Sequence, residues 1–527
     1  MNIKSIKFKL ITLMAVSLLV IAVSIVTISL SKASSALIQT NMAVLDAVKE
    51  SKKAHVTDFL TSLELLLLSK ATDAATVETM WALEDSFLEL EDEEEDVFDK
   101  EKITKELLNH YETQYLNKVN YKMKDSPYKR ETLDYLPQTL SGKIAQYLYI
   151  IDNQYPVGEK QKLSINKNTM VEYSKNHIEI HKAYVELAEN FGLYNIFLVN
   201  KDGYVVYTVA KEKDYATNVL DGPYKDTGLA EAFRKAKKLK SGEIAFADFK
   251  AYEPSYNDPA AFISSPLVYQ GDFEGVVIFQ IPRQRINDVM NFGGDYEKAG
   301  LGKTGTANLV CEEGCMKNDS RFLNQIDDQE VKDSGTTVSV MNVTSASTEA
   351  IRLGKTGSWI IENYKGIRVL SSYTTIKIYG QNWGMVVEIE EEEVLASIHE
   401  IRNVVLGISF GIFIVLLLLS VYLVQRLIIS KLGTLQSAAY DLAKGEGDLT
   451  QRISVPKGDE IYEVAENINA FIEKVRITVS EAKRSSSENT GIAQTLSEAS
   501  LIIRGKTENE ARIVAEVSSV GIDLQNV

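Results

Sequence analysis

The chain has 527 residues, and 45% of them are hydrophobic, which is enough to bury more than one core. Its formal net charge is −16. A nucleic-acid-binding surface needs clustered Lys and Arg, and no basic stripe is present, so nucleic acid is excluded as a partner.

Two stretches, residues 10–30 and 404–424, are apolar and uncharged. A helix of about 20 such residues crosses a membrane core of roughly 30 Å. The first stretch could instead be a signal peptide, since Lys4, Lys7 and Lys9 precede it, but its apolar core is longer than a signal peptide needs. We therefore predict two transmembrane helices.

The cations predict the orientation, because Lys and Arg are retained on the cytoplasmic side. Residues 1–9 carry three lysines, and Arg426 and Lys431 follow the second apolar stretch. Both termini are expected in the cytoplasm, with residues 31–402 outside. This predicts a multi-pass protein of the inner (cytoplasmic) membrane with a large periplasmic or extracellular region.

The outer region begins with a long amphipathic pattern over residues 32–70 that predicts a stalk helix. Further on, His177 and His181 share one helix face. They could bind a metal, but no third ligand follows from the spacing, so a packed or surface face is favoured and no metal site is predicted. Two β-rich runs joined through Lys201-Asp202-Gly203 predict a hairpin, and a second hairpin is expected over residues 263–281 around Gly271.

A second unit begins near residue 298. Cys311 and Cys315 lie at the end of its first strand, and the choice between a local disulfide and two free thiols stays open. The whole outer region thus predicts two α+β modules in series, a distal one over about 140–290 and a membrane-proximal one over about 298–395. The strands expected in the second module are residues 306–311, 358–362, 367–373, 376–379 and 383–390.

After residue 424 the sequence is helical again, with breaks at residues 445–448 and 456–459. Each flanking helix carries one apolar stripe, the first near Leu435 and the second near Ile468. Neither helix can bury its stripe alone, so a dimeric four-helix bundle is predicted over 425–480. Residues 481–527 read as the start of a coiled coil.

This cytoplasmic segment resembles a HAMP domain through Leu442-Ala-Lys-Gly-Glu-Gly-Asp-Leu-Thr-Gln-Arg-Ile453 and Gly458-Asp-Glu-Ile461. The family's connector pattern is met by Gly447, Leu449 and Ile453, and Glu460 stands at the acidic start of the second helix. The resemblance implies that these four residues relay a signal. The usual proline at the start of the first helix is absent.

The outer region resembles double Cache sensor domains. The resemblance implies a small ligand held against the sheet of the distal module, with Tyr207, Asp248, Tyr252, Phe262 and Gln280 as lining residues, although each could equally belong to the core. The Arg-x-Trp-Tyr and Tyr-x-Asp runs of the amino-acid-binding subset are absent, and Gln280 stands where that subset has an aspartate, so an α-amino-acid ligand is not supported. The match rests on Tyr155-Pro-Val-Gly-Glu-Lys160, Tyr207-Thr-Val-Ala-Lys-Glu-Lys-Asp-Tyr-Ala-Thr-Asn218, Asp221-Gly-Pro-Tyr224, Tyr252-Glu-Pro-Ser255 and Trp383-Gly-Met-Val-Val-Glu388.

The tail from Ser485 is similar to the start of a methyl-accepting chemotaxis signalling helix, and the chain ends before the hairpin tip that would contact a chemotaxis histidine kinase and its adaptor. The expected function is a homodimeric chemoreceptor, truncated in its signalling domain, with no cofactor. The alternative is the input half of a sensor enzyme, a histidine kinase or nucleotide cyclase. No His follows His399 and no catalytic centre is recognisable, so the chain is not expected to be an enzyme.

Overall fold

The computed structural model describes residues 5–92, 98–166, 171–444 and 447–523. They form two compact units, one of Leu30–Ile401 and one of Met1–Ser29 with Arg402–Val527. The first is the sensor region and is described first.

A single helix, α1 (Ile6–Ala71), contains both the first apolar stretch and the predicted stalk. It has no Gly or Pro to interrupt it, so the helix persists across the change from an apolar to an amphipathic sequence. Within the sensor region Leu45, Val56, Leu60, Leu63 and Leu67 recur on one face and are buried against the modules. The stalk prediction is confirmed.

The distal module is built on an antiparallel five-stranded sheet in the order β2-β1-β5-β4-β3. Both predicted hairpins are present, β1–β2 around Gly203 and β4–β5 around Gly271, and both glycines have the positive φ that such turns require. The strands are β1 (Asn195–Asn200), β2 (Val205–Thr208), β3 (Ala245–Tyr252), β4 (Asp258–Tyr269) and β5 (Asp272–Pro282).

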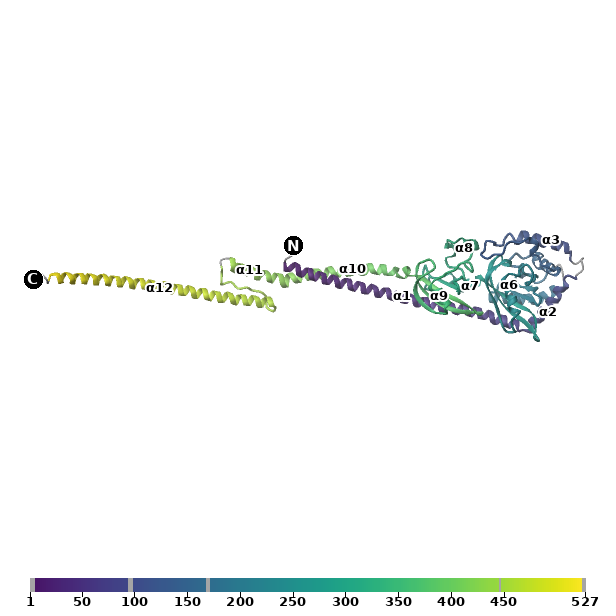
Figure 1. Ribbon diagram of the computed structural model, residues 1–527, viewed down its shortest axis with the longest axis horizontal. Helices are drawn as coiled ribbons and strands as arrows, with labels where there is room; N and C mark the ends of the chain where they lie inside the picture. Colours follow the sequence, from purple (N-terminus) through teal and green to yellow (C-terminus); the bar gives the residue numbers. More distant parts are fainter. Residues whose placement is uncertain (1–4, 93–97, 167–170, 445–446, 524–527) are drawn as a thin grey trace. The chain divides into compact units, whose positions relative to one another are not determined.

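Helices cover both faces of this sheet (Figure 1). On one face α6 (Gly228–Ala236) closes a small core with Phe197 and Phe262. The other face carries the larger core, to which the segments before residue 140 contribute, so the helical cover starts earlier than the predicted limit of the module. Its elements are α2 (Ala74–Glu89), α3 (Lys100–His110), η1 (Tyr111–Tyr115), η2 (Thr132–Tyr135), α4 (Leu140–Gln146), η3 (Tyr147–Ile151), η4 (Lys160–Lys162) and α5 (Glu172–Phe191).

The membrane-proximal module has an antiparallel four-stranded sheet in the order β6-β9-β8-β7. The prediction of separate strands over 367–373 and 376–379 was wrong, because Thr374 and Thr375 stay in register with Met385 and Gly384 and the strand runs on. The elements are α7 (Arg283–Met290), η6 (Phe292–Gly294), β6 (Thr306–Cys311), η7 (Leu323–Gln325), α8 (Gln329–Ser334), α9 (Ala346–Arg352), β7 (Gly357–Glu362), β8 (Arg368–Ile378) and β9 (Gln381–Glu390).

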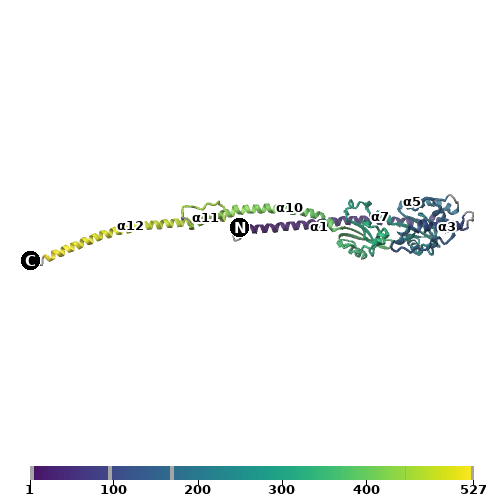
Figure 2. The ribbon, with the colours of Figure 1, turned by 90° about the horizontal axis from the view of Figure 1, so that it is seen from above.

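The two modules follow one another along α1 (Figure 2). Trp383 of the proximal module packs against Phe246 and Phe249 of the distal module, with ring centroids 6.0 and 6.4 Å apart. Beside these rings the Lys317 ammonium lies 2.7 Å from the Asp248 carboxylate. The contact between the modules is therefore an aromatic cluster with a buried ion pair.

Strand β9 passes directly into α10 (Glu391–Leu423), which continues through η8 (Val424–Ile429) into α11 (Ser430–Lys444). The HAMP segment lacks the usual proline at the start of its first helix, and the helical run is uninterrupted there. Among the residues described, two helical runs are long and apolar enough to cross a membrane, Ile6–Ala71 and Glu391–Lys444. The last helix is α12 (Glu460–Asp523), and Leu435, Ile453 and Ala465 form a small core between the connector, α11 and α12.

Candidate functional site

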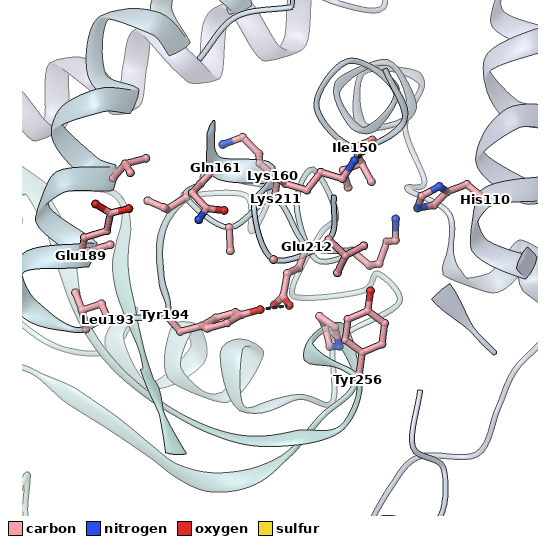
Figure 3. A pocket seen from close by; sticks show the side chains of 18 residues that line it. His110, Ile150, Lys160, Gln161, Glu189, Leu193, Tyr194, Lys211, Glu212 and Tyr256 are labelled. Atoms are coloured by element: carbon pink, nitrogen blue, oxygen red, sulfur yellow. Dashed lines mark hydrogen bonds between the residues drawn. The ribbon is translucent and has the colours of Figure 1, made fainter. Parts of the chain in front are cut away.

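The distal module contains a cavity of about 230 Å³ (Figure 3). It lies between α5, the segment after β2, the segment around η4 and the turn after β3. Apolar side chains form one part of its wall and a dense group of charged and polar side chains forms the other. The polar group comprises His110, Lys160, Gln161, Glu189, Tyr194, Lys211, Glu212, Lys213 and Tyr256.

Three lysines of this wall are buried, with exposed fractions of 8% for Lys160, 2% for Lys211 and 5% for Lys213. The Lys160 ammonium donates to the carbonyl oxygens of Ile150 and Asn153, both at 2.9 Å. None of the three forms an ion pair with any residue that the structure describes. Burial of a charge without a counter-ion is costly, so this arrangement is unusual for a purely structural core.

Lys211 and Lys213 are surrounded by aromatic rings. The Lys211 ammonium donates to the carbonyl of Thr208 and lies 4.4 Å from the ring centre of Tyr207. The Lys213 ammonium lies 4.9 and 5.8 Å from the ring centres of Tyr111 and Tyr115. Ring faces attract a cation but do not neutralise it, and burial holds the pKa of both lysines well below the usual range.

Two carboxyl groups alternate with these lysines in sequence. Glu212 accepts hydrogen bonds from the hydroxyls of Tyr194 at 2.7 Å and Ser255 at 2.5 Å, and burial, with the charge of Asp214, raises its pKa to about 8. Tyr252 donates to one oxygen of Asp214, while the other oxygen is buried and has no partner among the described residues. Burial raises the pKa of Asp214 to about 6.

Three of the five predicted lining residues lie behind this wall, Tyr207 at one contact from it and Tyr252 and Gln280 further back. The hydroxyl of Tyr252 binds Asp214, the amide of Gln280 donates to Ser255 at 3.2 Å, and the ring of Tyr207 faces Lys211. None of the three lines the cavity itself. A direct ligand role for them stays a prediction.

The other two predicted lining residues lie elsewhere. Phe262 packs in the core under α6, on the opposite face of the sheet from the larger core. Asp248 is engaged by Lys317 at the contact between the modules. The structure does not bring these two together with the cavity.

Sequence reasoning missed Lys160, Glu212 and Lys213. The run Lys211-Glu-Lys-Asp214 directly after a strand looks like any solvated loop, because four consecutive charges are normally exposed. The only signal was that the same run lies inside the segment quoted for the Cache resemblance. Its burial depends on aromatic rings far away in the sequence.

The two histidines of α5 belong to the packed interior, as favoured. His181 contacts the Tyr207 hydroxyl at 2.8 Å and the Gln161 carbonyl at 2.6 Å, and His177 contacts the Ser164 carbonyl at 2.6 Å. In the described part of the chain no group of three His, Cys, Asp or Glu side chains could hold a metal ion.

In the proximal module the sulfurs of Cys311 and Cys315 are joined as a disulfide. The disulfide closes the short turn that follows β6, and the backbone of Cys315 then pairs with Asn342 as an isolated β-bridge. Whether the pair is oxidised in the exported protein stays a prediction.

The connector of the cytoplasmic unit uses its predicted residues unequally. Ile453 is buried, and its backbone N–H and carbonyl pair with the Asn469 side chain at 2.8 and 2.9 Å. Leu449 is half-buried, and Glu460 begins α12. Gly447 has a positive φ of 66°, while residues 445 and 446 of the same motif lie outside the described residues.

Comparisons with known proteins support the Cache and HAMP assignments. Two curated relatives are methyl-accepting chemotaxis proteins: PctB of Pseudomonas aeruginosa is 24% identical over 249 residues, covering 47% of this chain and 36% of PctB. McpA of Pseudomonas putida is 28% identical over 115 residues, covering 22% of this chain and 18% of McpA. The chain thus spans well under half the length of these relatives.

Among solved structures, the ligand-binding domain of the P. aeruginosa amino acid chemoreceptor PctC, in complex with GABA, is 15% identical. That match has a TM-score of 0.26 and covers 38% of this chain and 74% of that domain. The family model for the HAMP domain matches residues 423–476. The family model for the Cache domain matches residues 33–398, which is more than half of the chain, and the protein therefore belongs to the Cache domain family.

Proposed function

We propose that this chain is the sensing and relay part of a transmembrane chemoreceptor. A small ligand binds in the distal cavity, and the HAMP domain passes the change to cytoplasmic signalling helices. The cavity carries the proposal, because it places three buried lysines, which form no ion pair with any described residue, inside the outer region of a Cache protein. Such groups are typical of binding sites.

The remaining features of the proposal concern the assembly. The chain works as a homodimer in the bacterial inner membrane, with both termini in the cytoplasm and the Cache domain outside. Val464 and Phe471 of α12 are exposed in the single chain, which supports a bundle completed by a second copy. A chemotaxis histidine kinase and its adaptor are the partners wherever a full signalling domain follows.

A chimera tests the relay. Residues 1–480 are joined to an intact chemoreceptor signalling domain, and kinase activity is measured with and without a ligand identified by binding. Ile453→Ser removes about 1.5–3 kcal/mol of side-chain burial, comparable with the 1–3 kcal/mol typical of coupling between sites, and should lock or bias the output. Leu449→Ser should act in the same direction with a smaller effect, because Leu449 is only half-buried.

The matched control is Lys457→Ser in the exposed part of the connector, which should respond like the parent chimera. Ligand affinity should be unchanged in all three variants. If Ile453→Ser and Leu449→Ser both respond like the parent, the connector is not the relay. A ligand that binds but never changes kinase output would remove the receptor assignment altogether.

A further inference from the structure

The distal cavity is lined by three buried lysines that have no carboxylate partner among the described residues. Lys213 is the clearest case, since its ammonium has no hydrogen-bond acceptor and no ion-pair partner among the described residues, only the ring faces of Tyr111 and Tyr115. Lys160 uses two backbone carbonyls and likewise lacks a carboxylate. The two cations repel one another as well as the nearby His110, whose pKa falls to about 3 through burial first and the charges of Lys213 and Lys160 next.

The carboxyl group of Glu212, which also lines the cavity, does not balance these lysines. The hydroxyls of Tyr194 and Ser255 occupy both oxygens of Glu212, and Figure 3 shows the contact with Tyr194. Glu212 forms no ion pair with a lysine among the described residues, because hydroxyl groups engage its oxygens. The wall therefore offers lysine ammonium donors to whatever enters.

We propose that the cavity binds a small organic anion, with its carboxylate held by the ammonium of Lys213 and supported by Lys160. This inference rests on the proposed function and names the ligand class of the same site. The volume of about 230 Å³ is below the ~300–1,000 Å³ of sites for drug-sized molecules, which limits the anion to a small metabolite. A bound carboxylate supplies the missing counter-charge.

The test uses the full chain in nanodiscs and a thermal-shift panel with four arms. The arms are small mono- and dicarboxylates such as lactate and succinate, inorganic phosphate, diamines such as putrescine, and neutral sugars. Carboxylates should raise the melting temperature, and calorimetry of the best one should give an affinity that falls at least tenfold in Lys213→Gln. The control is Lys182→Gln, which removes the charge of an exposed lysine on α5. This variant should bind the carboxylate with the wild-type affinity.

A further variant separates binding from folding. Lys213→Met keeps the aliphatic stem and removes a buried charge that has no partner, so the unliganded protein should melt at the same or a higher temperature while the shift with carboxylate disappears. A lower melting temperature without ligand would show that the lysine has a structural role.

Three outcomes would overturn the proposal: no carboxylate binds, carboxylates bind equally well to Lys213→Gln, or only phosphate, diamines or sugars bind. A diamine that binds and changes kinase output in the chimera would leave the receptor function standing and remove the anion. A carboxylate that binds in a Lys213-dependent way without changing kinase output would support the anion site and contradict the receptor function.

Discussion

The two modules of the sensor region share an antiparallel sheet but differ in what lies against it. The distal module contains a cavity of about 230 Å³ lined by three buried lysines, whereas a cavity of about 40 Å³ is found in the proximal module. The proximal module instead places Trp383, with an exposed fraction of 1%, between itself and the distal module. The comparison shows that one kind of module can enclose a cavity lined by lysines or pack tightly against its neighbour.

The largest expected effect comes from truncating the buried side chain of Trp383 in the proximal module. Trp383→Ala should destabilise β9 and the contact with Phe246 and Phe249 by about 3–5 kcal/mol, because a large buried side chain leaves a cavity. Hydrogen exchange of β8 and β9 in the full chain measures this. Trp359→Ala is the control: Trp359 is 61% exposed and makes one hydrogen bond of 2.6 Å to Tyr373, so about 1 kcal/mol should be lost. Equal losses would contradict the packing described.

Asp248 distinguishes binding from contact between the modules. Asp248→Asn leaves the buried Lys317 without its partner and should cost roughly 3 kcal/mol at this contact. Affinity for a carboxylate bound in the cavity should change by no more than about threefold, since the two sites share no side chain. Calorimetry and thermal unfolding of the same variant give both numbers. A loss of affinity without a loss of stability would restore Asp248 to the ligand site.

Glu388 gives the proximal module a pH dependence. Burial raises its pKa to about 7, with the Ser371 hydroxyl donating at 2.9 Å and Tyr364 nearby. The folded state binds this proton more tightly than the unfolded state, so stability should fall as the pH rises from about 4.5 through 7, by about 1–3 kcal/mol. Glu388→Gln should reduce the slope of stability against pH in thermal unfolding between pH 5 and 8, while Glu212 and Asp214 keep their own contributions. An unchanged slope would show that another group titrates there.

The smallest expected effect concerns the turn at Cys311 and Cys315. A loop of so few residues loses little chain entropy on closure, so Cys311→Ser with Cys315→Ser should cost no more than about 2 kcal/mol and leave carboxylate binding in the distal module unchanged. Mass spectrometry of non-reduced, alkylated protein tests the bridge itself. Labelling of both thiols would show that the pair is free.

The features that the sequence by itself determined are those set by local pattern. The apolar stretches, the stalk helix, the Asp202-Gly203 turn and the connector motif each depend on residues within one or two turns of one another. Family resemblance added the Cache and HAMP assignments, which the family models support. These features need no knowledge of which distant segments meet.

Only the tertiary structure decided where the charges of the cavity lie. Lys213 is buried because helices from the start of the sensor region fold over it, and its own carbonyl meets the Tyr111 hydroxyl 102 residues away. The same holds for Asp248, whose partner Lys317 comes from the other module, and for β8, which continues past residue 373 because β9 pairs along its whole length. A charged residue looks the same in sequence whether solvent or a ring faces it, and long-range packing alone makes that choice.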